Sequence, residues 1–198
     1  MSEDGVNQRR RLLLVTTGLG LVGTAFAATP FVLSMTPSAR AKAAGAPVEV
    51  DISKIEPGQL LTIEWRGKPV WIVRRTPEML KALPTIDAKL ADPKSEVKDQ
   101  QPDYAQNATR SIKPEIMIVV GICTHLGCSP DKRLEAGAVS GLGADWTGGF
   151  FCPCHGSLFD LAGRVYKNVP APTNLPVPPH KYLTDGRIVI GEDQKGAA

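Results

Sequence analysis

Two short stretches decide the fold of this chain: CTHLGC at residues 123–128, called box 1, and CPCHGS at residues 152–157, called box 2. Together they contain all four cysteines and two of the three histidines of the 198 residues. Box 1 has a Cys-x-His pair, box 2 has a Cys-x-x-His pair, and each has one further cysteine. Thiols and imidazoles at such short spacings are typical of metal sites.

The four paired side chains suit a two-iron, two-sulfur cluster, in which two histidines replace two cysteines on one iron. A structural zinc site is an alternative, and such sites commonly use Cys-x2–4-Cys spacing. Here the two cysteines are five positions apart in box 1 and two apart in box 2, so neither spacing is the usual zinc knuckle. Two plain disulfides are a second alternative, but they leave the histidine beside a thiol in each box unexplained. The residues favour the cluster.

A long segment near the amino terminus has no charged residue between Leu12 and Ala39. A helix needs about 20 apolar residues to cross a bilayer, so we expect a transmembrane anchor at 12–35, after a short tail at 1–11. The sequence RRRLL at 9–13 resembles a twin-arginine export signal. A cleaved signal peptide is the alternative. Small residues at 36–47 then predict a flexible linker.

The composition indicates a loop-rich, mainly β body at 48–198 rather than a helical bundle, since there are 19 Gly and 17 Pro. The net charge of +3 is small, and no cluster of basic residues alternates with aromatic ones, so we expect no nucleic-acid partner. The three tryptophans are expected in the core or in turns. His180 lies outside both boxes and is expected at the surface.

Local patterns predict several elements of this body. Short β-rich runs at 60–65 and 69–73 flank a turn, and runs at 181–184 and 187–190 flank Asp185-Gly186, a strong hairpin signal. Thr76-Pro77 predicts the start of a short helix. Residues 116–122 predict a buried strand leading into box 1. The polar segment 84–115 is weakly periodic and is expected to be a solvated excursion without chemistry.

Five prolines lie between residues 168 and 179, in a proline-rich stretch. With this stretch, the two boxes and the anchor, nearly the whole chain resembles the Rieske iron–sulfur subunit of bacterial cytochrome bc-type quinol–cytochrome c reductases. The resemblance implies an antiparallel β-sandwich head with a small cluster-binding subdomain at about 116–178 and one amino-terminal transmembrane helix. It also implies one Rieske 2Fe-2S cluster, with Cys123 and Cys152 on one iron and His125 and His155 on the other. The two remaining cysteines, Cys128 and Cys154, would form a disulfide between the boxes.

The resemblance further implies a function in electron transfer. The head would take one electron from quinol, most simply ubiquinol, held by a cytochrome b subunit, and pass it to the haem of a cytochrome c1-type subunit in a dimeric complex. His155 and His125 would couple that electron to a proton, since each iron-bound imidazole keeps a second ring nitrogen. The expected disulfide places the head in the periplasm, on a bacterial inner membrane. The alternative is the Rieske subunit of a periplasmic oxidase such as an arsenite oxidase, but the long anchor and linker argue against it.

Four further features refine this interpretation. Ser157 matches a family hydroxyl that bonds a bridging sulfide of the cluster. Phe159 stands where many high-potential members have a tyrosine, which predicts a lower reduction potential. The stretch PAPTNL at 170–175 resembles the rigid loop that covers the cluster, although a polyproline ligand for a partner is also possible. Leu126 is expected to be exposed near the cluster and to form part of the docking surface.

Overall fold

The computed structural model describes residues 3–39, 41, 45–193 and 196–197, and the chain divides into two compact units at 1–43 and 44–198. The first unit contains one long helix, α1 (Glu3–Ser34), and its stretch Gly5–Ser34 is long and apolar enough to cross a membrane. Helix α1 includes residues 3–11 of the expected tail and residues 12–34 of the expected anchor. Residues 40 and 42–44 of the expected linker lie outside the described residues.

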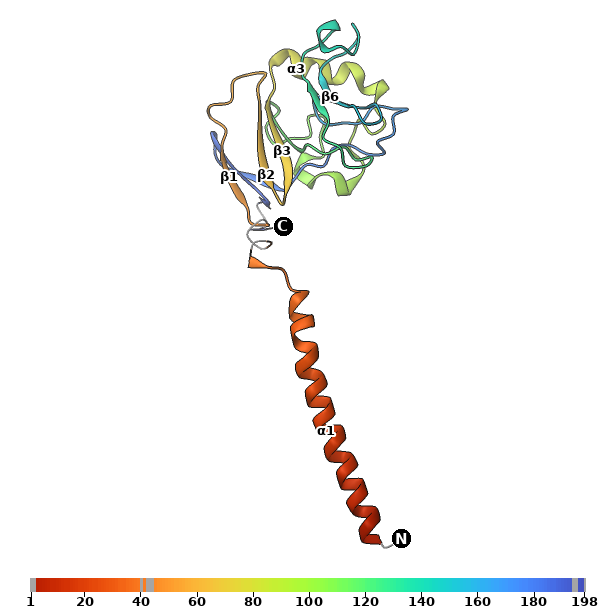
Figure 1. Cartoon of the computed structure of the whole chain (residues 1–198). Helices are drawn as coiled ribbons and strands as arrows, with labels where there is room; N and C mark the ends of the chain where they lie inside the picture. Colours follow the sequence, from red (N-terminus) through yellow and green to blue (C-terminus); the bar gives the residue numbers. More distant parts are fainter. Residues whose placement is uncertain (1–2, 40, 42–44, 194–195, 198) are drawn as a thin grey trace. The chain divides into compact units, whose positions relative to one another are not determined.

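The second unit is the head, a mainly β structure as predicted (Figure 1). Its described residues form three antiparallel three-stranded sheets, with strand orders β1-β9-β8, β2-β3-β4 and β5-β6-β7, and a short β10-β11 pair. The strands are β1 (Val48–Asp51), β2 (Leu60–Trp65), β3 (Lys68–Arg74), β4 (Ile116–Val120), β5 (Asp131–Arg133), β6 (Gly149–Cys152), β7 (Ser157–Asp160), β8 (His180–Thr184), β9 (Arg187–Ile190), β10 (Glu192–Asp193) and β11 (Gly196–Ala197).

The sheet β2-β3-β4 packs on both of its faces. Successive side chains of a strand point to opposite faces. Trp71 and Val73 of β3 accordingly lie in one buried cluster with side chains of β6 and β7, whereas Val70 and Ile72 lie in another with side chains of β1 and β9. This double burial explains why β3 and β4 are continuous apolar runs rather than alternating ones. The sheet β5-β6-β7, which contains the strands on either side of box 2, is therefore fixed to the rest of the head through one face of β3 and β4.

The predicted turns and caps are confirmed. In the β2–β3 hairpin, Arg66 and Gly67 both have positive φ, 53° and 69°, as a type I′ turn requires. Strands β8 and β9 form the second hairpin around residues 185–186. Helix α3 (Pro77–Ala82) begins with Thr76 as its cap, whose hydroxyl accepts a hydrogen bond from the Met79 amide. All three tryptophans are buried, as expected.

The prediction of a solvated excursion at 84–115 is wrong. The segment contains short 3-10 helices at Leu83–Lys89, Lys98–Gln100 and Asp103–Ala105, and another 3-10 helix lies at Ala138–Ser140. Leu90, Ala105 and Arg110 are completely buried. Much of this burial is polar: the Arg110 guanidinium donates to main-chain carbonyls and to a glutamine side chain. Such packing leaves no hydrophobic periodicity for the sequence to reveal.

The expectation of a surface position for His180 is also wrong, since only 2% of this residue is exposed. Its Nδ1 lies 2.9 Å from the carbonyl oxygen of Pro178, and its ring meets Tyr104 edge-on. Burial lowers the pKa of His180, while the Pro178 carbonyl opposes this effect. His180 is therefore part of the packed junction between the proline-rich stretch and β8.

Candidate metal centre

The two boxes fold into the same turn. In box 1 the Gly127 amide donates to the Cys123 carbonyl at 3.1 Å, and in box 2 the Gly156 amide donates to the Cys152 carbonyl at 2.9 Å. Both glycines have left-handed backbones, with φ of 86° and 79°, which glycine adopts without steric cost. Box 1 follows β4, and box 2 joins β6 to β7. The shared Cys-x3-Gly spacing was visible in the sequence as a sign of this equivalence.

The first cysteine of each turn is buried and free. Cys123 and Cys152 are each 2% exposed, they lie in the same buried hydrophobic cluster, and the Cys152 thiol is close enough to raise the pKa of Cys123. Burial raises the pKa of the Cys123 thiol, while the backbone amide of His125 opposes that rise. Two adjacent thiols with little access to water provide a soft donor pair, which suits iron in a cluster or zinc.

The histidines of the two boxes also meet. The ring centroids of His125 and His155 lie 4.8 Å apart, with the rings nearly perpendicular at 84°. His125 is half-buried, and His155 is exposed. The four side chains predicted as ligands therefore form a thiol pair and an imidazole pair, with one member of each pair from each box. This donor set fits a 2Fe-2S cluster of the Cys2His2 type.

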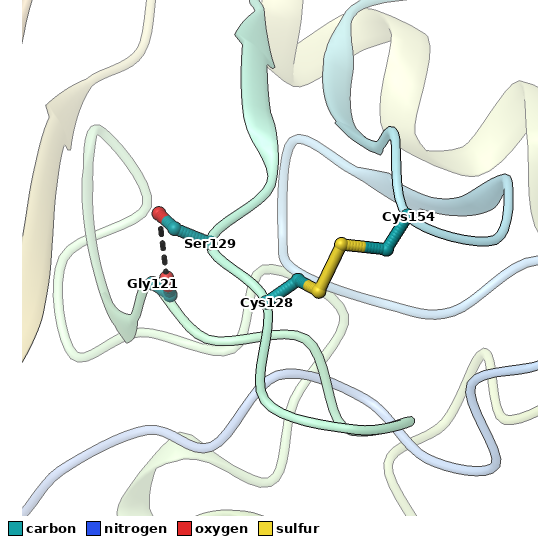
Figure 2. Close-up of a disulfide and its surroundings, with 4 residues drawn as sticks. All are labelled: Gly121, Cys128, Ser129 and Cys154. Atoms are coloured by element: carbon teal, nitrogen blue, oxygen red, sulfur yellow. Dashed lines mark hydrogen bonds between the residues drawn. A yellow bond between two sulfur atoms is a disulfide. The ribbon is translucent and has the colours of Figure 1, made fainter.

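A disulfide joins the boxes, as the resemblance implied. Cys128 and Cys154 are bonded with an S–S length of 2.08 Å and a Cα–Cα distance of 6.7 Å (Figure 2). Directly after box 1, the Ser129 hydroxyl donates to the Gly121 carbonyl at 3.3 Å, which holds the two ends of the box together. The Cys152 sulfur lies within 4.8 Å of both disulfide sulfurs. These three sulfurs do not form a metal site, because a disulfide has no thiolate to offer.

The proline-rich loop at 170–175 contacts both boxes. From box 1, the Thr124 hydroxyl donates to the Thr173 carbonyl at 2.7 Å. Directly after the turn of box 2, the fully buried Ser157 accepts at Oγ a hydrogen bond of 3.0 Å from the Ala171 amide. The Ser157 hydroxyl lies close enough to the Cys123 thiol to lower its pKa, against the larger effect of burial. The loop is thus attached to both turns by hydroxyl side chains.

Several residues that hold this loop were missed by the sequence interpretation. The Arg110 guanidinium donates to the Leu175 carbonyl at 2.8 Å and to the Ala162 carbonyl at 3.2 Å. The Asn174 side chain accepts from the Val165 amide at 2.8 Å. No local pattern marks these positions. The buried ion pair between Asp160 and Arg164, at 2.8 Å, did have a signal, since charges of opposite sign stand four residues apart.

Comparison with known proteins identifies the family. The Rieske [2Fe-2S] domain matches residues 89–179, and the TAT signal of the ubiquinol–cytochrome c reductase Fe-S subunit matches residues 1–38. The chain is 64% identical over 199 residues to the ubiquinol-cytochrome c reductase iron-sulfur subunit of Allochromatium vinosum, covering 100% of this chain and 95% of that protein. This chain belongs to the ubiquinol–cytochrome c reductase iron–sulfur subunit family. The corresponding subunit of Blastochloris viridis is 42% identical over 193 residues, covering 96% and 97%.

Among solved structures, a hyperthermophilic respiratory Complex III is similar with a TM-score of 0.46 and 29% identity, over 88% of this chain and 97% of that one. The family assignment rests on the sequence relatives. It confirms the Rieske-type fold, the 2Fe-2S cofactor and membership of a cytochrome bc complex, and it argues against the zinc and plain-disulfide alternatives. The amino-terminal region combines an export signal with a helix able to anchor the chain in a membrane.

Proposed function

We propose that this chain is the electron-carrying subunit of a quinol–cytochrome c reductase. It takes one electron, coupled to a proton, from quinol bound in a cytochrome b subunit, and passes the electron to the haem of a cytochrome c1-type subunit. The observation that carries the proposal is the pairing of the His125 and His155 rings, which stand two and three residues after the buried Cys123 and Cys152. A redox centre with two imidazoles at its outer side can exchange both an electron and a proton.

In this proposal Cys123 and Cys152 hold one iron, and His125 and His155 hold the other. When bound, the cluster supplies one-electron redox chemistry at a potential raised by the neutral imidazoles. The burial of both thiols excludes water from the sulfur side of the site. The disulfide between the boxes keeps the two turns together while the charge of the site changes.

His155 is the residue proposed to face the quinol, because its side chain is exposed whereas His125 is half-buried. One nitrogen of the ring binds iron, and the other is free to hydrogen-bond the quinol hydroxyl and accept its proton. His125 offers a second ring nitrogen of the same kind. Both histidines are in this sense catalytic.

The remaining assignments concern location and partners. Helix α1 is proposed to anchor the chain by a single pass in the bacterial inner membrane, with the head in the periplasm, where a disulfide persists. The assembly is proposed to be dimeric, with ubiquinol as the quinol. The linker at 36–47 would let the head move between the quinol site and the haem.

The proposal is tested with His155→Cys in the full chain, within its membrane complex. This variant keeps an iron ligand but removes the second ring nitrogen. We expect a paramagnetic signal from the reduced cluster, loss of quinol-dependent cytochrome c reduction, and loss of one ionisation from the pH dependence of the midpoint potential. His180→Asn is the control, since it changes the one histidine outside the boxes and keeps a donor toward the Pro178 carbonyl. Full turnover by His155→Cys, or zinc in place of iron in the purified wild type, would contradict the proposal.

A further inference from the structure

The Ser157 hydroxyl is held between the proline-rich loop and a cysteine sulfur. Ser157 is fully buried, and its Oγ accepts the Ala171 amide hydrogen at 3.0 Å. A serine hydroxyl has only one hydrogen to donate. Because the Ala171 amide occupies one side of the oxygen, that hydrogen is left for another acceptor. The cysteine sulfurs are the candidates, because Ser157 pairs in register with Cys152 across β6 and β7 and its hydroxyl lowers the pKa of the Cys123 thiol.

The Ala171 amide is itself held in place independently of Ser157. Pro170 and Pro172 stand on either side of it, and proline restricts both its own φ and the conformation of the residue before it. The Thr124 hydroxyl donates to the Thr173 carbonyl, two residues further along the loop. Arg110 then fixes the end of the loop through the Leu175 carbonyl. The loop therefore presents one amide hydrogen at a fixed place beside box 2.

We propose that Ala171 is a positioning residue for the redox centre: its amide orients the Ser157 hydroxyl toward the sulfur atoms of the cluster and so raises the reduction potential. This inference rests on the proposed cluster at Cys123, Cys152 and the two histidines. Hydrogen bonds to cluster sulfur stabilise the reduced state, which is the more negative one. An amide that donates to the hydroxyl oxygen also polarises its O–H bond, which strengthens the donated bond by roughly 10–30%. Without that amide, the hydroxyl is free to rotate to another staggered position.

The test combines Ala171→Pro with Ser157→Ala, in the full chain within its complex. Proline removes the amide hydrogen, and Ala171 already precedes a proline, which favours an extended backbone at this position. With Ser157 present, we expect Ala171→Pro to lower the ratio of reduced to oxidised cluster at a fixed potential by roughly three- to tenfold, where tenfold equals about 59 mV for one electron. In the Ser157→Ala background the same change should alter the ratio by less than about twofold, since the hydroxyl is already absent.

The readout is a redox titration of the paramagnetic signal. Equal falls in both backgrounds would mean that Ala171 acts through general loop structure, and no fall with Ser157 present would mean that it does not act at all; either result overturns the inference. Thr85→Val is the control, because it removes a hydroxyl contact outside the loop and the boxes, the 2.6 Å bond to the Ala82 carbonyl, so the ratio should not change.

If Ala171→Pro does not assemble a cluster, the loosened loop Pro170→Gly/Pro172→Gly is titrated in the same two Ser157 backgrounds, with the same criteria. Absence of the cluster signal from the wild type would instead refute the proposed function. The two failures are therefore distinguishable.

Discussion

Box 1 and box 2 have the same backbone turn, but they carry different side chains on it. Both begin with a buried cysteine and have a left-handed glycine at the fifth position. The third position is His125 in box 1 and Cys154 in box 2, the fourth is Leu126 and His155, and the sixth is Cys128 and Ser157. The shared backbone therefore places the first thiol in the same way in both boxes. The histidine and the disulfide cysteine stand at different positions of the turn in the two boxes.

The division has a physical consequence for the two histidines. His155 stands one position later in its turn than His125, and it is exposed where His125 is half-buried. The disulfide also joins unlike positions, the sixth of box 1 to the third of box 2. The pair of turns is therefore asymmetric. Substitutions at equivalent positions of the two boxes are expected to affect different properties, such as cluster assembly, stability or turnover.

The largest expected effect comes from comparing the two cysteines of box 2. Cys152→Ser removes a proposed iron ligand, so we expect complete loss of the cluster's paramagnetic signal. Cys154→Ser, two residues later, removes only the disulfide, and a cluster should still assemble. Iron content and the signal of the reduced protein measure both outcomes. A cluster that survives in Cys152→Ser, or is lost equally in both variants, would break the proposed division between ligand and cross-link.

The next effect concerns the cross-link itself. Cys128→Ser/Cys154→Ser opens a loop with a sequence separation of 26 residues. Chain entropy then predicts a loss of about 3–4 kcal/mol in the free energy of unfolding of the head. Denaturant titration measures this loss, and dithiothreitol provides the control, since it should destabilise the wild type but not the double variant. Equal stability of variant and wild type would show that the boxes hold together without the bond.

The two boxes and several turns of the head could be predicted from the sequence, because their determinants are local. The spacing of Cys and His predicted both boxes, Asp185-Gly186 predicted a hairpin, and Thr76 predicted a helix cap. These signals depend on a few neighbouring residues and their backbone preferences. They are therefore visible before the chain is folded.

The support around the boxes could not be predicted. Arg110 is buried among main-chain carbonyls that come from distant parts of the chain, and His180 is buried against Pro178 and Tyr104. Polar groups buried in this way follow no helical or strand period, so the segment 84–115 had the composition of a solvated loop. Only the tertiary structure shows which carbonyls a buried guanidinium will meet.

A smaller effect is expected at Phe159, on the strand that follows box 2. Phe159 is fully buried and pairs in register with Phe150 across β6 and β7. Phe159→Tyr adds a hydroxyl at the position where the family resemblance implies a tyrosine, and one further hydrogen bond to a ligand sulfur should raise the potential by about 20–60 mV. Redox titration of the cluster signal measures it.

Phe150→Tyr is the control for Phe159→Tyr, since it buries a hydroxyl against the stacked ring of Trp71 instead. That control should lower the stability of the head without raising the potential. An unchanged or lower potential in Phe159→Tyr would contradict the tuning argument.

The smallest effect is expected at the fourth position of box 1. Leu126 is 72% exposed, as predicted, and it occupies the place that His155 has in box 2. Because an exposed side chain contributes little to folding, Leu126→Ala should change the free energy of unfolding by less than about 0.5 kcal/mol. If Leu126 contacts the quinol-binding partner, quinol-dependent turnover should still fall by about threefold, as for a modest interface residue. Val139→Ala is the matched control, since Val139 is 80% exposed elsewhere in the head and should leave turnover unchanged. Equal turnover in both variants would contradict a role for Leu126 in docking. His155 of box 2 would then be the proposed point of contact with quinol.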